Sequence, residues 1–439
     1  MSTILIKFVQ LMLSFTILVL VHELGHYLLA RLFRVRVDKF YIFFNPWFSL
    51  FKYKPKGSDT EWGIGWLPFG GYCKINGMID ESLDRSIEGT TPQPYEFRSK
   101  PAWQRFLIMV AGVVFNFLLA IVIYAGIIYT WGRDELPSAR IENGMAFSPV
   151  AEYAGFRDGD IILATDGRPA DILDAGFMRS VAQAESVQVR REGVDTTLLM
   201  PDDLMKRLLL DGRGLMYIRF PFVVGEVVPG KPAERAGLKA GDKLLAIEGR
   251  KVDEFRQARA EIHSRRGQVV PMTFERNGEV LDLSVPIDTA GQIGVLTEMD
   301  LSKLYQVDHH SYNLIEAVPA GVRLGVTTLK GYIGDMKYVF TPEGASQIGG
   351  FGSIGNLFPP VWDWRAFWSM TALLSVILSV MNLLPIPALD GGHIVFLLIE
   401  MITRRKMKEQ WLIRAQLIGM FLLFALMIYA NVKDLVRFL

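Results

Sequence analysis

The chain has 439 residues, of which 50% are hydrophobic, and its mean hydropathy is +0.25. This composition is typical of a membrane protein, and the net charge of +1 gives no electrostatic reason to expect nucleic-acid binding. The single cysteine, Cys73, excludes a disulfide within the chain and a cysteine cluster for a metal. Any metal site must therefore use histidine and carboxylate side chains.

Four segments are apolar enough to cross a bilayer, which takes about 20 residues. They are 8–33, 106–131, 367–384 and 415–432. Lys7 and the apolar run after it are similar to the start of a signal peptide, but the run continues well past a short hydrophobic region. We therefore predict that the first segment is a retained membrane helix.

Lysine and arginine cluster at one end of each predicted span, at 31–39, 98–105 and 404–414. Basic residues are retained on the cytoplasmic side of a membrane, so we predict that these ends face the cytoplasm. Both termini and the long segment 132–365 then lie outside, which in a bacterium with two membranes is the periplasm. The protein would accordingly be a multi-pass protein of the inner membrane.

The first span carries the motif HELGH, which contains His22, Glu23 and His26. Histidines four residues apart share one face of a helix and can bind one Zn²⁺, while the glutamate can take a proton from metal-bound water. The motif also arises by chance in soluble helices. Here it interrupts an apolar span, where a central charge costs about 2.5–3.5 kcal/mol and is functional by default, so we predict a metal site.

A catalytic zinc needs a third protein ligand and an open position for water. The segment 382–393 follows the third span and has the sequence NLLPIPALDGGH. Its two prolines cannot continue a helix, so we expect the backbone to unwind, which membrane proteins tolerate where the chain lines a cavity. Asp390 and His393 are both candidates for the third ligand. Because the third span runs inward, either can meet the HELGH motif near the cytoplasmic face.

The region between the first two spans is aromatic and rich in turns. Residues 40–54 are strand-like, and 62–72 predicts a β-hairpin. Tryptophan and tyrosine prefer the membrane interface. We therefore predict a small membrane-associated sheet beside the active site, with an ordinary amphipathic surface hairpin as the alternative.

The outer segment contains an internal repeat. The sequence AEYAGFRDGD at 151–160 recurs as AERAGLKAGD at 233–242, and strand-like residues follow each copy. The pattern resembles PDZ domains, which bind extended peptides such as C-termini by adding a strand to a sheet edge. Glycines that merely form turns are the alternative, but the duplication favours two domains, at 133–220 and 221–297.

Two further segments complete the predicted organisation. Residues 314–338 have apolar residues at helical spacing with basic residues among them, which predicts an interfacial helix. The glycine-rich stretch 344–355 predicts a loop. We assign both to a linker, 298–363, which precedes a C-terminal membrane part, 364–439, while 1–132 form the N-terminal membrane part.

These motifs resemble the site-2 protease family of intramembrane zinc metalloproteases, and in layout the regulator-of-sigma-E proteases of bacteria. The matching features are HELGH in the first span, NxxPxPxLDGG after a later one and the repeats between them. Residues 68–72 and 95–105 also match, as does AGVVFNF at 111–117, where Val113 stands in place of the family's proline. The resemblance covers essentially the whole chain.

The resemblance implies a fold and a set of roles. The fold is a polytopic α-helical membrane protein with four spans, a membrane-associated sheet and two outer PDZ-like α+β domains. His22, His26 and Asp390 are implied as the zinc ligands. Glu23 is implied as the general base and Asn382 as a contact to the substrate backbone, with capping of the broken helix as the alternative role for Asn382.

The resemblance also implies the class of substrate. The family cuts single-span membrane proteins, such as anti-sigma factors or signal-peptide remnants, after another protease has shortened them on the outer side. The resemblance implies that the tandem PDZ domains filter out substrates with bulky outer domains. A catalytically silent membrane scaffold is the main alternative, and the intact Glu23 argues against it. A metal carrier is a second alternative, but we would expect it to place ligands in the other spans as well.

A membrane helix hides its peptide bonds in internal hydrogen bonds, so a substrate must open into an extended strand before it is cut. We expect such a strand to pair with a sheet edge, because strand addition satisfies its exposed backbone groups. The predicted edge consists of Pro68, Phe69, Gly70, Gly71 and Tyr72.

Overall fold

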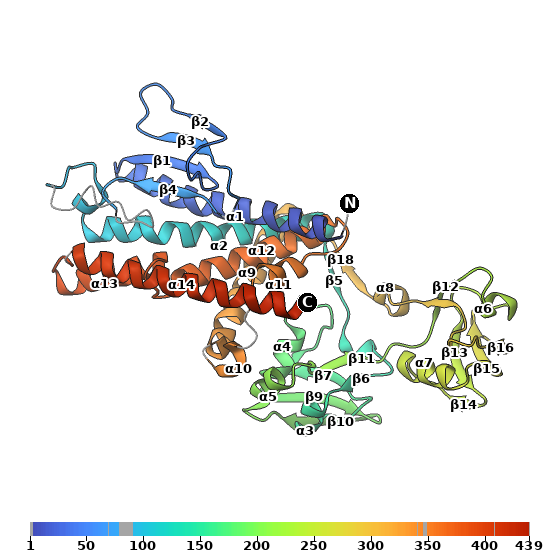
Figure 1. Cartoon of the computed structure of the whole chain (residues 1–439). Helices are drawn as coiled ribbons and strands as arrows, with labels where there is room; N and C mark the ends of the chain where they lie inside the picture. The colour runs from blue at the N-terminus through green and yellow to red at the C-terminus, as the bar shows by residue number, and fades with distance from the viewer. Residues whose placement is uncertain are drawn as a thin grey trace. The chain divides into compact units, whose positions relative to one another are not determined.

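The computed structural model describes residues 3–68, 70–78, 91–339, 341–345, 349–407 and 409–438. These residues fold into two compact units (Figure 1). The membrane unit contains Met1–Gly132 and Ser311–Leu439, and the β-rich unit contains Arg133–His310.

Within the described residues, four helices of the membrane unit are long and apolar enough to cross a bilayer. They are α1 (Thr3–Leu32), α2 (Ala102–Trp131), α12 (Trp364–Leu383) and α14 (Glu409–Phe438). The four predicted spans are therefore confirmed as apolar helices. A further helix, α13 (Asp390–Thr403), begins directly after the proline-rich break that follows α12.

Helix α2 is the centre of the membrane unit, because α1, α12 and α13 all pack against it (Figure 1). A Cβ on Gly25 of α1 would lie 2.7 Å from a carbonyl oxygen of α2, so the two backbones approach closely. Ser375 and Ser379 of α12 donate to the backbone oxygens of Asn116 and Val113 in α2, at 2.7 and 3.0 Å. Close approach and interhelical hydrogen bonds hold helices together in lipid, where the hydrophobic effect does not.

A four-stranded sheet packs against α1 (Figure 1). Its strands, in the order β2-β3-β1-β4, are β1 (Val37–Ile42), β2 (Phe51–Tyr53), β3 (Glu61–Ile64) and β4 (Tyr72–Ile75). The predicted hairpin over 62–72 is wrong, because β1 lies between β3 and β4 and runs parallel to β3. Tyr41 of β1 favours this pairing: its ring fills the space that a Cβ on Gly63 would need, and its hydroxyl donates to Glu61. Strand β4 is left at an edge of the sheet.

The β-rich unit contains two modules with the same order of antiparallel strands, β10-β9-β7-β8 in the first and β16-β15-β13-β14 in the second. The strands are β7 (Ile161–Thr165), β8 (Arg168–Pro169), β9 (Ser186–Arg191), β10 (Val194–Leu199), β13 (Lys243–Ile247), β14 (Arg250–Lys251), β15 (Val269–Arg276) and β16 (Glu279–Pro286). Two-stranded sheets accompany them: β6 (Met145–Phe147) with β11 (Met216–Ile218), and β12 (Val224–Val227) with β17 (Val295–Thr297). The sequence repeat is therefore a repeat of structure.

Each module has an apolar core of its own. The helices are α3 (Pro149–Tyr153), α4 (Phe177–Ala182) and α5 (Leu204–Asp211) in the first module, and α6 (Pro232–Arg235) and α7 (Phe255–Ser264) in the second. One arginine ties the repeated motif to the sheet in both modules. Arg191 donates twice to the buried Asp160, and Arg276 donates twice to the buried Asp242.

The two ends of the β-rich unit meet in a two-stranded ribbon of β5 (Arg133–Glu135) and β18 (Asp308–His310). Helix α8 (Leu301–Leu304) precedes β18, and 3-10 helices occur at η2 (Phe97–Ser99) and η3 (Ser138–Arg140).

In the part of the chain that the structure describes, three helices lie between the ribbon and α12. Helix α9 (Leu314–Val339) confirms the predicted helix and packs on α2 through Gly321 and Gly325. The predicted loop over 344–355 is wrong in part, because α10 (Pro342–Ala345) and α11 (Phe351–Asn356) overlap its two ends, and 346–348 lie outside the described residues. Side chains of α14, Asn431 and Asp434, accept hydrogen bonds from backbone amides of α11, which explains a helix in so glycine-rich a sequence.

Candidate active site

Helix α1 carries His22 and His26 one turn apart on one face, and both residues are buried, with 8% and 6% of their surface exposed. Their Nε2 atoms lie 3.3 Å apart. The four-residue spacing directs both rings to the same side of the helix. The expected pairing of the two histidines is therefore present in the fold.

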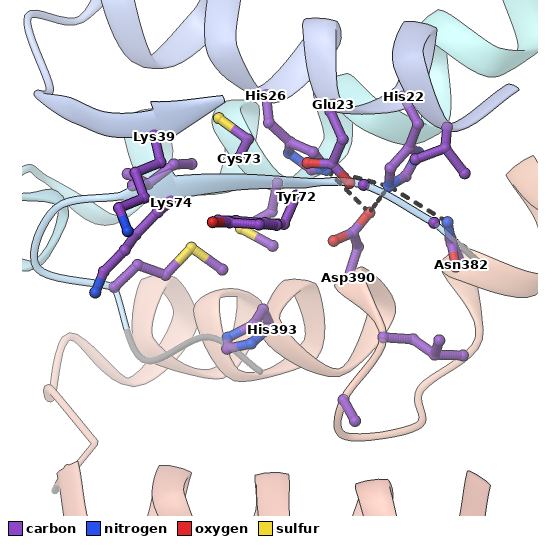
Figure 2. Close-up of a pocket in the computed structure, with 18 of the residues that line it drawn as sticks. His22, Glu23, His26, Lys39, Tyr72, Cys73, Lys74, Asn382, Asp390 and His393 are labelled. Carbon is purple, nitrogen blue, oxygen red and sulfur yellow. Dashed lines mark hydrogen bonds and ion pairs between the residues drawn. The ribbon is translucent and has the colours of Figure 1, made fainter. Parts of the chain in front are cut away.

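Asp390 comes from the far end of the chain and reaches the same point. Its Oδ2 atom lies 3.2 Å from Nε2 of His22 and 3.3 Å from Nε2 of His26 (Figure 2). The chain leaves α12 at Leu383, passes two prolines and Ala388, whose φ is +81°, and becomes helical again at Asp390. The predicted break in the helix thus directs this carboxylate toward the histidines.

The hydrogen bonds of the two Nδ1 atoms leave both Nε2 atoms unprotonated in the neutral rings and able to bind a metal ion. Nδ1 of His26 donates to the Ile108 carbonyl oxygen at 2.9 Å, so its Nε2 carries no proton in the neutral ring. Nδ1 of His22 lies 3.1 Å from the side-chain amide of Asn116, whose buried Oδ1 otherwise lacks a partner among the described residues. The amide atom at this distance is Nδ2, and turning the amide by 180° exchanges it with Oδ1, so that Nδ1–H of His22 donates to Oδ1 and both groups are satisfied. Metal-binding histidines commonly donate their second nitrogen in this way.

The set of donor atoms fits Zn²⁺. Two imidazole nitrogens and one carboxylate oxygen lie within 4.8 Å of one another. The Oδ2 atom of Asp390 is buried, and it has no hydrogen-bond partner among the residues that the structure describes. A buried carboxylate oxygen is costly unless it is paired or coordinates a metal. Three nitrogen and oxygen ligands with a fourth position open are typical of catalytic zinc.

Gly112 of α2 makes room for the two rings. A Cβ there would lie 2.4 Å from Nε2 of His26 and 2.7 Å from Cε1 of His22. The sequence matched Gly112 and Asn116 only as members of a family motif and predicted no role for either. A small residue and a polar residue four positions apart in an apolar span indicate a helix face that packs closely on polar groups of a neighbouring helix.

A cavity of about 600 Å³ lies against these side chains. Its walls include α1, β4 with the turn before it, the end of α12, the start of α13 and Gln416 of α14. This volume is within the range of ligand-binding clefts, so the cavity can hold a few residues of an extended peptide.

Glu23 lines the cavity beside the two histidines (Figure 2). The backbone amide of Cys73 in β4 donates a hydrogen bond to its carboxylate. This contact joins the edge strand to α1 and keeps the carboxylate directed at the cavity. A carboxylate in this position can act as a general base.

The two further polar candidates both line the cavity but differ in their relation to the histidines. Nδ2 of Asn382, at the end of α12, lies 3.4 Å from Nε2 of His22. His393 lies one turn after Asp390 and is not part of the group of potential metal ligands within the described residues (Figure 2). Of the two alternatives for the third ligand, the fold brings Asp390 to the histidines.

The predicted substrate edge is only partly at the cavity. Gly70, Gly71 and Tyr72 line it. Pro68 lines a small neighbouring hollow next to α1 instead. Phe69 lies outside the described residues.

Comparison with known proteins identifies the family. The family model described as peptidase family M50 matches residues 10–426. The chain belongs to peptidase family M50. A protein of Ralstonia nicotianae, named as a candidate zinc metalloprotease, is 30% identical over 97% of this chain and 97% of its own length. Protease RseP of Yersinia pestis is 27% identical over 100% of both chains, and the regulator of sigma E protease of Haemophilus influenzae is 29% identical over 97% of each.

The resemblance to site-2 proteases is thereby confirmed. As a member of family M50, the protein is a zinc metalloprotease. Its apolar helices make it a multi-pass membrane protein, and the cluster of His22, His26 and Asp390 lies among those helices. The M50 chain is therefore an intramembrane metalloprotease.

Proposed function

We propose that this protein hydrolyses a peptide bond within or next to the transmembrane segment of single-span membrane proteins. In this proposal His22, His26 and Asp390 bind the zinc ion, and Glu23 is the general base. The observation that carries it is the convergence of two Nε2 atoms and a carboxylate oxygen in a cavity walled by apolar helices. Substrates that are themselves in the bilayer reach such a site most directly.

The chemistry divides between the ion and the side chains. When bound, zinc polarises the carbonyl group of the scissile bond and lowers the pKa of water to about 7. Glu23 takes a proton from the attacking water and delivers it to the leaving amine. The Cys73 amide orients the Glu23 carboxylate for both transfers. We assign Asn382 as a donor to a substrate carbonyl, because its amide lines the cavity next to His22.

The position of β4 supports a mode of substrate binding. This strand lies at the edge of its sheet and lines the cavity, so an unwound substrate segment can add to it as a further strand. Gly70 and Gly71 carry no side chains that would obstruct the pairing, and Tyr72 flanks it. We extend the substrate contact to Pro68 and Phe69, which precede them in the chain.

The β-rich unit is assigned to substrate selection. We assign 133–220 and 221–297 as PDZ-like domains that receive peptide C-termini and exclude bulky substrates. The shared strand order and separate cores of the two modules support this. The basic clusters support an orientation in the bacterial inner membrane with this pair and both termini in the periplasm. Two relatives named RseP and regulator of sigma E protease support regulated proteolysis of an anti-sigma factor or signal-peptide remnant after a first outer cut.

The test is cleavage of a tagged single-span substrate by purified wild-type protein and by Glu23→Gln, with the zinc content of both measured. We expect only the wild type to cut while both hold zinc, and we expect Asp390→Ala to lose the metal. The proposal fails if the wild type holds no zinc, or if Glu23→Gln cuts as fast as the wild type.

A further inference from the structure

The loop that carries Asp390 into the site depends on a contact from another helix. This loop, 384–389, joins α12 to α13 and contains two prolines, which have no N–H group. The N–H groups of Leu384, Ile386 and Leu389 donate to carbonyl oxygens within three residues. The remaining N–H group, on Ala388, donates to Oε1 of Gln416 in α14 at 3.2 Å. Among the described residues, the Ala388 N–H group is therefore the backbone donor of the loop whose acceptor lies on another helix.

Gln416 is a polar residue that is buried in an apolar membrane helix. It is only 4% exposed, and it lines the cavity that holds the histidines. Polar groups buried in a membrane are costly and mark functional positions. The residue it contacts, Ala388, has a φ of +81°, a strained backbone conformation for a residue with a side chain, and such a conformation persists only where the surrounding structure imposes it. The bond to Gln416 is such a constraint.

Gly419 lies one turn after Gln416 and faces the same loop. A Cβ at this position would be 1.7 Å from the carbonyl oxygen of Pro387 and 2.3 Å from its carbonyl carbon. Both of these atoms are backbone, so no side-chain rotation could relieve the clash. Helix α14 therefore packs directly on the loop with its own backbone, and any side chain larger than hydrogen would push the two apart.

The rest of α14 indicates that these contacts are specific. Only 11% of its most apolar stretch is buried by the rest of the protein, so general packing fixes this helix weakly. Among the described residues, α14 makes side-chain hydrogen bonds to the loop through Gln416 and to α11 through Asn431 and Asp434. Helix α11 in turn packs on α1, where Phe351 meets Phe15 edge-on. Helix α14 thus connects the loop before Asp390 with the helix that carries both histidines.

We propose that Gln416 and Gly419 are positioning residues of the zinc site, which hold the loop so that the Asp390 carboxylate meets both imidazole rings. The inference rests on the proposed role of Asp390 as a zinc ligand. The two histidines are fixed by one continuous helix, whereas Asp390 follows a loop with two prolines and a left-handed residue. A ligand on such a segment needs support from outside, and the support here comes from α14.

The experiment compares variants of the full-length protein in detergent. Gln416→Met keeps the side-chain length but removes the acceptor, and Gln416→Glu keeps an acceptor oxygen. Gln410→Met is the matched control, because Gln410 is exposed on the same helix. Gly419→Ala adds the clashing Cβ, and Gly126→Ala is its control, since a Cβ there would meet no atom of the described residues within 4 Å. Zinc affinity by chelator competition, the visible spectrum of the Co²⁺-substituted protein, and kcat and KM are measured for each.

We expect Gln416→Met to bind zinc about 10- to 100-fold more weakly, as is typical when the support of a ligand is removed. We also expect an altered Co²⁺ spectrum and a lower kcat with a nearly unchanged KM, with Gln416→Glu restoring most of each. Gly419→Ala is expected to act in the same direction, and both controls to match the wild type. If Gly419→Ala does not accumulate as folded protein, the Gln416 variants decide the question.

The inference is overturned if Gln416→Met keeps wild-type zinc affinity, Co²⁺ spectrum and kcat, even when its melting temperature falls, because the residue is then merely structural. Asp390→Ala separates this result from a failure of the proposed function. If Asp390→Ala also keeps its zinc, the ligand assignment itself is wrong. If Asp390→Ala loses zinc while Gln416→Met does not, only the role of α14 is refuted.

Discussion

Replacing Gly112 with alanine is expected to disable the metal site while the protein stays folded. The new Cβ would lie 2.4 Å from Nε2 of His26, whereas ordinary contacts begin at 3.4 Å. Helix α2 is held near this point by hydrogen bonds from Ser375 and Ser379, so the histidine rings must give way. The rings must move by about 1 Å, and a misplacement of that size costs about 100-fold in rate at a catalytic centre.

The helix propensity of alanine stabilises α2, whereas the added Cβ crowds the metal site. A loss of zinc therefore cannot be ascribed to a weakened helix. Alanine is more favourable than glycine in a helix interior by about 0.8–1.0 kcal/mol, so the substitution does not weaken α2 by itself. Loss of zinc with unchanged helix content would therefore report crowding at the rings. Gly126→Ala, on the same helix, is the control because a Cβ there would have no neighbour within 4 Å among the described residues.

The assay measures zinc content after dialysis, helix content by circular dichroism and the rate of cleavage of a single-span substrate. We expect Gly112→Ala to cut about 100-fold more slowly than the wild type, and Gly126→Ala to cut at the wild-type rate. Wild-type zinc content and cleavage in Gly112→Ala would refute the close packing of both rings on α2.

Three further predictions concern other contacts. Asn116→Leu removes the partner of a histidine Nδ1 and is expected to lower zinc affinity about 10- to 100-fold in chelator competition. Burial alone would raise the pKa of the Asp242 carboxyl, but hydrogen bonds from Arg276 and a backbone amide hold it below its ordinary value of 3.8. The ionised carboxylate therefore stabilises the fold fully above pH 3.8, and this stabilisation is lost as the pH falls through the lowered pKa. Asp242→Asn removes the titrating group. It should therefore flatten the acid side of a plot of melting temperature against pH. Glu400→Gln leaves the buried Arg105 without its ionic partner and should lower the melting temperature, and the double substitution of both by methionine should recover part of the loss.

The parts of the site that the sequence predicted are those that local rules determine. The spacing of His22 and His26 and the length of apolar sequence around them define a helix with both rings on one face. The prolines after α12 define a break, and Asp390 follows it. By their chemistry, Asp390 and His393 could each be the third metal ligand. Only the fold shows that Asp390 is the one close to the histidines, because the direction of each side chain depends on the rotation of α13 about its axis.

The parts that the sequence did not predict depend on contacts between distant segments. The parallel pairing of β1 with β3 requires Tyr41 to lie over Gly63, and no local pattern states this. Likewise α11 is helical because Asp434, far along the chain, accepts from one of its amides. Gln416 is a single polar residue in an apolar span, and its role becomes visible only when its partner, the Ala388 amide, is known.

The three proposed ligands are held by segments that differ in how firmly they are packed, which predicts the order in which the site comes apart. His22 and His26 lie on an unbroken helix of 30 residues, and their rings are enclosed between α1 and α2. Asp390 is attached through a loop that α14 supports, and α14 is the least buried of the four spans. Conditions that loosen weakly packed helices, such as short-chain detergents, should therefore displace α14 before they separate α1 from α2. Zinc would then be lost from a protein whose helix content is unchanged, because the carboxylate leaves the site first.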